Sequence, residues 1–312
     1  MARPTHVRWI GETPTLTSPV IVAAFTGWND AADAASNAVT NLVEGWGARL
    51  LAEIDPEEFT DFATTRPRVR LREGGRRVID WPAVRLWHVR GAGGDVVLML
   101  GPEPSTRWKL FSRVVLAVAE KLGASMMLTL GALLADVPHS RPVQLIGTAS
   151  DPEVIARHGL QRSRYEGPTG IVGVLQDAFH AASIPSASLW AAVPAYASQV
   201  PSPKATLALM RRACEIIGTP APVASVMQLI DRYEEQVDSL VNDDDDLVAY
   251  VERLEHMTDE GMSIDDEVDE DQLPLQYAEP GRRDDGGGDG DGDDAGTLLA
   301  EVEQFLRDQS GG

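Results

Sequence analysis

Between Val20 and Ala195 the sequence alternates short apolar runs with amphipathic stretches. The runs PVIVAAF, DVVLMLG and IPSASLWAAVP are almost continuously apolar and bounded by turn residues, as strands buried on both faces are. The stretches between them repeat apolar residues with the period of a helix. One of them carries apolar residues at Trp108, Phe111, Val115, Val118 and Leu122. This alternation predicts an α/β fold: a three-layer α/β/α sandwich around a mostly parallel or mixed sheet.

The pattern becomes purely helical after Pro203. We therefore expect an α/β core domain over residues 1–200 and a helical C-terminal subdomain over residues 201–258. The stretch DDGGGDGDGDDAG has too few apolar residues to form a core, so residues 259–296 are expected to be an acidic disordered linker. Residues 297–312 are expected to form a terminal amphipathic helix with a Gly-Gly tail.

The formal net charge of -21 is concentrated near the C-terminal end. Residues 231–312 hold 28 acidic and 5 basic residues, whereas residues 1–230 hold 20 acidic and 22 basic ones. An acidic tail repels nucleic acid and anionic membranes, and no run reaches the roughly 18 apolar residues of a spanning helix. We expect neither nucleic acid nor membrane as a partner. With one cysteine and no secretory leader pattern, we expect a cytoplasmic protein.

Polar side chains follow three of the predicted strands. They are Trp28, Asn29 and Asp30 after the first, Glu103 and Arg107 after another, and Asp136, His139 and Arg141 after a third. The carboxyl ends of parallel strands share one edge, where open α/β sheets bind ligands, so we expect these side chains to lie near one another. His139 is a candidate general base oriented by Asp136, and Arg141 a candidate anion-binding residue. Taken singly, solvated loop residues or a helix cap at Asn29-Asp30 are the more ordinary interpretation.

Gly167-Pro168-Thr169-Gly170 precedes an apolar helix pattern that begins at Ile171. Such a loop can present backbone N–H groups and a helix N-terminus to an anion. It lacks the lysine of a P-loop and the spacing of GxGxxG, so we favour the interpretation that Thr169 caps the helix. Thr169 also borders the strand-end edge and completes the candidate ligand or interface residues there.

The sequence contains no GxSxG elbow, HExxH, Walker sequence or cysteine-histidine arrangement. Cys214 lies on the apolar face of a predicted helix, where an inert buried thiol is expected. The stretch DGDGDD lacks the twelve-residue frame of a calcium loop. We therefore expect no cofactor and no metal, and we assign no catalytic residue.

A series of motifs, GWNDAADAASNAV, LGPEPSTRW, LGALLADVPHSRPV, YEGPTGIVGVLQDA and PSPKATLALM, runs through the chain. With these motifs the sequence resembles the actinobacterial branch of the proteasome assembly chaperone 2 family, over nearly its whole length except the acidic linker. The resemblance implies a sandwich similar to phosphorylase/hydrolase-like folds, with a helical C-terminal part. It also implies self-association as a trimer or larger oligomer. Eukaryotic and archaeal relatives act as proteasome assembly factors, which makes proteasome subunits candidate partners, whereas the actinobacterial branch has no established biochemical role.

Three functional hypotheses stay open at this point. The first is a non-catalytic protein-interaction oligomer that resembles proteasome assembly chaperones. The second is a small-ligand-binding or hydrolase/phosphorylase-like enzyme that uses the strand-end loops. The third is a structural oligomer in which Trp28 and Trp108 anchor subunit contacts. One departure bears on the first hypothesis: such chaperones dock on the proteasome through a C-terminal hydrophobic-tyrosine-any tripeptide, and this sequence ends in Ser310-Gly311-Gly312.

Overall fold

A computed structural model describes residues 6–261 of the chain, and these lie within one compact unit. The acidic linker and the terminal helix with its Gly-Gly tail, expected from residue 259 onward, fall almost wholly outside the described residues. No helix in the described range is long and apolar enough to cross a membrane.

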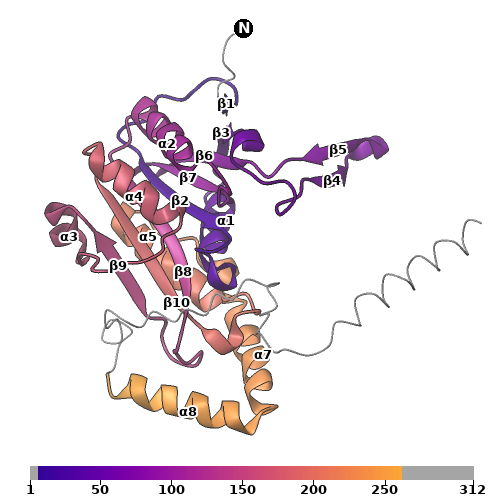
Figure 1. The fold of residues 1–312 in the computed structure, drawn as a ribbon, viewed down its shortest axis with the longest axis vertical. Coiled ribbons are helices and arrows are strands. Elements are labelled where there is room, and N and C mark those ends of the chain that lie inside the picture. Colours follow the sequence, from indigo (N-terminus) through magenta and orange to yellow (C-terminus); the bar gives the residue numbers. More distant parts are fainter. Residues whose placement is uncertain (1–5, 262–312) are drawn as a thin grey trace, which may run out of the picture. The chain divides into compact units, whose positions relative to one another are not determined.

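The centre of the molecule is one eight-stranded sheet with the strand order β1-β3-β6-β7-β2-β8-β10-β9 (Figure 1). Its strands are β1 (Val7–Trp9), β2 (Val20–Thr26), β3 (Arg49–Ile54), β6 (Val84–Gly91), β7 (Gly94–Pro102), β8 (Met126–Ala135), β9 (Leu145–Ala149) and β10 (Ser186–Pro194). The central strands β7, β2, β8 and β10 are mutually parallel, and the strands that flank them are antiparallel. The sheet is therefore mixed, with a parallel centre.

Helices cover both faces of this sheet, which confirms the three-layer α/β/α sandwich. The helices are α1 (Ala34–Gly45), α2 (Trp108–Leu122), α3 (Pro152–His158), α4 (Ile171–Ala181), α5 (Pro203–Ile217), α6 (Ala224–Met227), α7 (Ile230–Asn242) and α8 (Asp245–Asp259). Short 3₁₀ turns lie at Ala31–Asp33, Pro56–Glu58, Glu73–Gly75 and Ala195–Ala197. Helices α1 and α5 pack together on one face, and α2 and α4 on the other.

Strand β2 shows why an apolar run becomes a central strand. Because successive side chains of a strand point to opposite faces, Ile21 and Phe25 pack toward α2 and α4, and Val22 packs toward α1 and α5. All three are fully buried. Phe25 meets Phe111 of α2 edge-on, with ring centroids 5.9 Å apart. Fully burying such a side chain contributes about 1.5–3 kcal/mol, so a strand apolar on both faces is stable only between two helical layers.

A two-stranded ribbon projects from the sheet between β3 and β6 (Figure 1). Its strands are β4 (Arg68–Leu71) and β5 (Arg77–Asp80), which pair antiparallel. The stretch RVRL pairs with RVID, because Gly74 and Gly75 adopt positive φ angles that turn the chain back at once. The stretch VRLWHV belongs to β6 and joins the large sheet.

The helices after residue 200 belong to two different packing environments. The apolar face of α5, including Met210 and Cys214, is part of the core between α1 and the sheet. Helices α7 and α8 form a smaller apolar cluster around Tyr233, Val237 and Val251. The stretch from Val223 onward is not one continuous helix, because the chain breaks between α6 and α7. The expected domain boundary after residue 200 stays a prediction.

Candidate functional site

The parallel centre of the sheet brings several strand ends to one edge. The loops after β2, β7, β8 and β10 all begin there, because these four strands run in the same direction. The first loop is tied directly to its neighbour: the backbone N–H of Ala132 in β8 donates to the backbone oxygen of Asn29, at 2.9 Å. The side chains of this edge form two groups of contacts, one around Glu103 and one around His139.

Glu103 connects three elements at the strand-end edge. Its Oε1 accepts a hydrogen bond from Asn29 Nδ2 and another from the backbone N–H of Ile171, each at 2.7 Å. Asn29 follows β2, Glu103 follows β7, and Ile171 is the first residue of α4. A carboxylate at this position accepts an N–H that the helix cannot satisfy itself and lies at the positive end of the helix dipole. The carboxylate of Glu103 therefore lies at the N-terminus of α4, in the position that an anionic ligand would take.

This contact answers the question raised by the Gly167–Gly170 loop. The interpretation of Thr169 as a helix cap is wrong: Gly170 is the N-cap residue, and no side chain of the loop caps the helix. Glu103 takes the role instead, from more than sixty residues away. Gly170 also has no room for a side chain, since a Cβ there would lie 2.2 Å from Asn29 Oδ1. The loop closes over a buried amide.

Asp30 accepts hydrogen bonds at the N-terminus of a second helix, α1. Its Oδ1 accepts from the backbone N–H groups of Ala35 and Ser36, at 2.8 and 3.0 Å, so it caps α1 as the sequence suggested. The intervening Ala32 and Asp33 have positive φ angles, a conformation that costs about 1–2 kcal/mol per residue. Burial raises the pKa of Asp30 above its ordinary value. Two acceptor atoms here, Asn29 Oδ1 and Asp30 Oδ2, are buried without a hydrogen-bond partner among residues 6–261.

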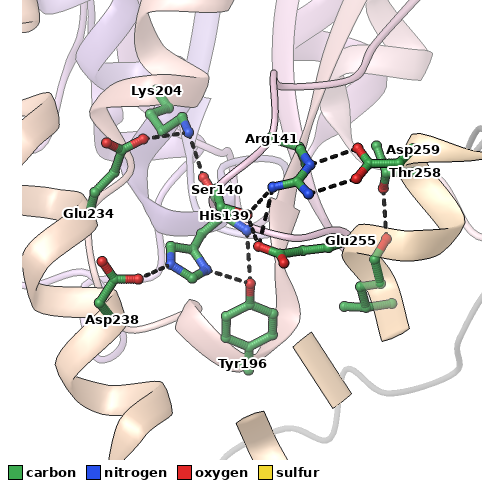
Figure 2. A network of polar contacts seen from close by, with 11 residues as sticks. His139, Ser140, Arg141, Tyr196, Lys204, Glu234, Asp238, Glu255, Thr258 and Asp259 are labelled. Carbon is green, nitrogen blue, oxygen red and sulfur yellow. Dashed lines mark hydrogen bonds and ion pairs between the residues drawn. The ribbon is translucent and has the colours of Figure 1, made fainter. Parts of the chain in front are cut away.

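His139 is buried in the second group, where both of its ring nitrogens have partners (Figure 2). Nδ1 lies 2.9 Å from Tyr196 Oη, and Nε2 lies 2.8 Å from Asp238 Oδ1 in α7. The backbone N–H of His139 also donates to Tyr196 Oη, at 2.8 Å. Desolvation raises the pKa of Tyr196. A carboxylate oxygen accepts hydrogen bonds, so Nε2 is the ring nitrogen placed to donate to Asp238.

The structure does not support the pairing of His139 with Asp136. Asp136 Oδ1 instead accepts a hydrogen bond from Tyr250 Oη of α8, at 2.7 Å. A general base needs a free nitrogen within reach of its substrate, and both nitrogens of His139 are used in contacts with other parts of the chain. Sequence reasoning missed Tyr196 and Asp238, because their contacts with His139 span 57 and 99 residues and leave no local pattern.

Arg141 and Lys204 extend this network to the C-terminal helices (Figure 2). Arg141 forms a two-pronged contact with Asp259 of α8, at 2.8 and 2.7 Å, and lies 3.3 Å from Glu255. Lys204 Nζ donates to the backbone oxygen of His139 at 2.5 Å and pairs with Glu234 of α7 at 2.7 Å. The loop after β8 therefore holds α7 and α8 against the sheet domain. The guanidinium of Arg141 is engaged with carboxylates of its own chain.

The remaining candidates, Trp28 and Arg107, lie at the surface. Trp28 is 42% exposed. Arg107 has a positive φ of 54° and pairs with the carboxylate of Glu58. Trp108, the other tryptophan considered as an interface anchor, donates its indole N–H to the backbone oxygen of Pro104. Of these two tryptophans, Trp28 is the more exposed and is therefore better placed for contact with another molecule.

A shallow cleft borders the His139 group, between the loop after β8 and strand β10. It measures about 270 Å³ including the space open to solvent, and His139, Arg141, Lys204 and Tyr233 contribute to its walls. The enclosed space within it is only about 10 Å³, which is room for about one water molecule, so the cleft is too small for a ligand site. Within residues 6–261 no group of three or more histidine, cysteine, aspartate or glutamate side chains is arranged to hold a metal ion.

Comparisons with known proteins agree with this architecture. The model of the PAC2 family matches residues 24–241. A PAC2 family protein from Streptomyces avermitilis is 46% identical with a TM-score of 0.70, and the match covers 75% of this chain and 99% of that one. The Mycobacterium tuberculosis proteasome-assembly chaperone homologue Rv2125 is 45% identical with a TM-score of 0.67, covering 74% of this chain and 99% of that one.

More distant structures share the fold. The archaeal proteasome activator PbaB from Pyrococcus furiosus is 13% identical, with a TM-score of 0.63 over 76% of this chain and 99% of that one. At this identity the likeness shows the fold alone. A search of curated proteins finds no match.

Proposed function

Since the chain belongs to the PAC2 family, we propose that it is a non-catalytic, self-associating protein that acts in proteasome assembly in the cytoplasm. The observation that carries this proposal is its 45% identity, over 99% of the relative's length, to a protein described as a proteasome-assembly chaperone homologue. The partner class named for this relative is therefore the first one to test.

The state of the strand-end edge supports a non-catalytic role. Glu103 bonds to Asn29 and to the start of α4, His139 bonds to Tyr196 and Asp238, and Arg141 bonds to α8. The groups that an enzyme of this architecture would direct at a substrate are used here to hold loops and helices together. The small size of the neighbouring cleft points the same way.

The ribbon supports self-association. Val69, Leu71, Ile79 and Trp81 are 53, 73, 52 and 45% exposed. Val69 and Leu71 are two residues apart, and Val69 pairs with Ile79, so strand alternation places Val69, Leu71 and Ile79 on one face, here called the apolar face, which also carries Arg77 opposite Leu71. A two-stranded ribbon alone is marginally stable in water, and burying this face against another subunit would contribute about 1 kcal/mol per side chain. We also propose that the self-associated form is a trimer or a larger oligomer.

The assembly role is tested with purified proteasome α and β subunits from the organism that encodes the chain. We expect the full chain to co-elute with one of these subunits in size-exclusion chromatography and to speed the appearance of assembled particles on native gels. Val69→Asp/Leu71→Asp/Ile79→Asp disrupts the apolar face, and Met227→Asp/Leu229→Asp is the control at exposed apolar residues elsewhere. If the full chain neither co-elutes nor changes the assembly rate at about 50 µM, far above the Kd of a specific assembly factor, the proposed role is wrong.

Self-association is tested separately by light scattering on the same samples. We expect the native chain at a multiple of its 33.7 kDa mass, the apolar-face variant at the mass of one chain, and the control variant at the native mass. A native chain that is monomeric at about 50 µM contradicts self-association, because obligate subunit interfaces have Kd values well below that concentration.

One observation favours the alternative of a small-ligand site or a hydrolase/phosphorylase-like enzyme. The unpartnered acceptors Asn29 Oδ1 and Asp30 Oδ2 lie at the edge where open α/β sheets bind ligands. A ligand that donates hydrogen bonds to them would stabilise the native state and raise the Tm. A thermal-shift screen with nucleosides, phosphates and carboxylic acids tests this, and the absence of any shift at millimolar ligand contradicts it.

A further inference from the structure

The ribbon has a second face with a different character. Arg68, Arg70 and Asp80 lie on the side opposite the apolar face, because Arg68 is paired with Asp80 and alternates with Val69. Arg72 continues β4 in an extended conformation, and its backbone N–H donates to the backbone oxygen of Arg76 at 3.0 Å. We call the surface formed by Arg68, Arg70, Arg72 and Arg76 the basic face. All four residues are exposed.

Within residues 6–261, few carboxylates pair with the arginines of the basic face. Asp80 is shared: it lies 3.1 Å from Arg70 and 2.6 Å from Arg85. Arg68, Arg72 and Arg76 have no ion-pair partner among the described side chains, which do not include that of Glu73. Like charges that face each other across a strand pair destabilise it, so this arrangement costs the isolated ribbon stability. Residues 1–230 are close to neutral, with 22 basic and 20 acidic residues, so four exposed arginines on one face of the ribbon are a local concentration of positive charge.

We propose that the basic face binds an extended acidic segment of a partner protein. Residues on one face of a strand repeat about every 7 Å, so carboxylates at alternate positions of an extended peptide have the spacing of Arg68, Arg70 and Arg72. Guanidinium groups match carboxylates with two parallel hydrogen bonds. The ribbon is a separate two-stranded sheet, so its outer edges are open to an added strand. The basic and apolar faces lie back to back and bind independently.

The same arginines could contact phosphates, but the side chains around them favour carboxylates. Single-stranded nucleic acid is usually held by aromatic side chains that stack on bases, and the one apolar side chain on this side of the strands is Val78. The acidic segment is therefore the occupant to test, and RNA is the competing outcome.

The experiment measures the fluorescence anisotropy of labelled probes titrated with the full chain. The probes are a twelve-residue peptide that alternates Glu and Thr, a peptide with six Thr followed by six Glu, and a twelve-nucleotide single-stranded RNA. We expect the alternating peptide to bind most tightly, about fivefold more tightly than the block peptide, because only its carboxylates match the repeat of the strand on one side. Its Kd should rise with salt concentration.

Three variants locate the site. Arg68→Glu/Arg72→Glu/Arg76→Glu should weaken binding of the alternating peptide at least tenfold, since each exposed pair is worth up to about fivefold in affinity. Arg113→Glu/Arg157→Glu/Arg164→Glu makes the same charge change at exposed arginines away from the ribbon and should keep the Kd within about twofold. Arg68→Gln/Arg72→Gln/Arg76→Gln removes the charge without reversing it and should give an intermediate loss, which guards against a ribbon unfolded by new repulsion.

Each other result overturns the proposal. An equal loss in the ribbon and control variants would show unspecific attraction to net charge. Equal Kd values for the two peptides would show that the alternating spacing does not matter. Tighter binding of RNA than of either peptide would assign the basic face to nucleic acid.

Discussion

Replacing Glu103 with alanine would remove the acceptor of two hydrogen bonds that connect β2, β7 and α4. The Asn29 amide and the Ile171 backbone N–H would lose their partner at 2.7 Å, and both of these residues are completely buried. Among residues 6–261 the structure gives neither donor a second acceptor, so both donors would lose their protein partner.

The size of the effect follows from these two contacts. A hydrogen bond to an ionised group is worth about 1.5–3 kcal/mol, and Glu103 is itself only half buried, so we take the lower value for each bond. We therefore expect Glu103→Ala to lower the free energy of unfolding by about 3 kcal/mol, which corresponds to a fall in Tm of about 6–12 °C for a unit of this size. Glu103→Gln keeps an acceptor oxygen in place and should cost only about 1 kcal/mol.

Urea denaturation followed by far-ultraviolet circular dichroism measures these differences. Glu58→Ala is the matched control, because Glu58 also pairs with a strand-end residue, Arg107, but at the surface, where such a pair is worth about 0.2–1 kcal/mol. If Glu103→Ala costs no more than Glu58→Ala at an unchanged m-value, the carboxylate does not hold the edge together and the reasoning is refuted. A Gln variant as unstable as the Ala variant would show that charge, and not the acceptor geometry, stabilises α4.

Three further results are expected. Burial raises the pKa of Asp30, so the stability that this carboxyl contributes is present at low pH and is lost as the pH rises through its folded-state pKa. Urea denaturation between about pH 4 and pH 8 should therefore show the free energy of unfolding of Asp30→Asn rising relative to that of the native chain. A difference that stays constant with pH would contradict the assignment. Arg141→Ala removes the contacts with Asp259 and Glu255. In limited proteolysis this variant should be cut within α8 faster than the native chain, while the sheet domain stays intact. An unchanged rate of cleavage would show that α8 is held by other contacts. Burial raises the pKa of Cys214 to about 12, so a thiol reagent at pH 8 should label the native chain only after urea is added. Rapid labelling without urea would show that α5 opens readily.

The three layers of the fold could be predicted from the sequence, because buried strands and helices repeat apolar residues with the period of their own geometry. A strand such as β2 needs apolar residues on both faces, and α2 needs them every three to four residues, so both could be located without coordinates. The gathering of Asn29 and Glu103 at one edge also followed, from the common direction of parallel strands.

What the sequence could not show is which partner each polar side chain takes. Thr169 was the best local candidate for the α4 cap, but Glu103 outcompetes it from another strand, and no rule of spacing along the chain reports such a contact. His139 appeared available as a base because Asp238 and Tyr196 are distant in sequence. Acidic residues of α7 and α8, namely Glu234, Glu255 and Asp259, pair with cations of the sheet domain, and no spacing along the chain indicates these pairs.

The pairing of Ile54 with Val84 has a consequence for how this chain can change. Strand β3 ends and β6 begins at directly opposed positions, so residues 55–83 leave the sheet and return to it at the same point. The outer part of this excursion, the β4–β5 ribbon, could be shortened or exchanged without altering the register of a central strand, whereas Phe59 is buried against Phe111 and belongs to the core. The ribbon can therefore change in length or sequence while the pairing of the central sheet stays the same.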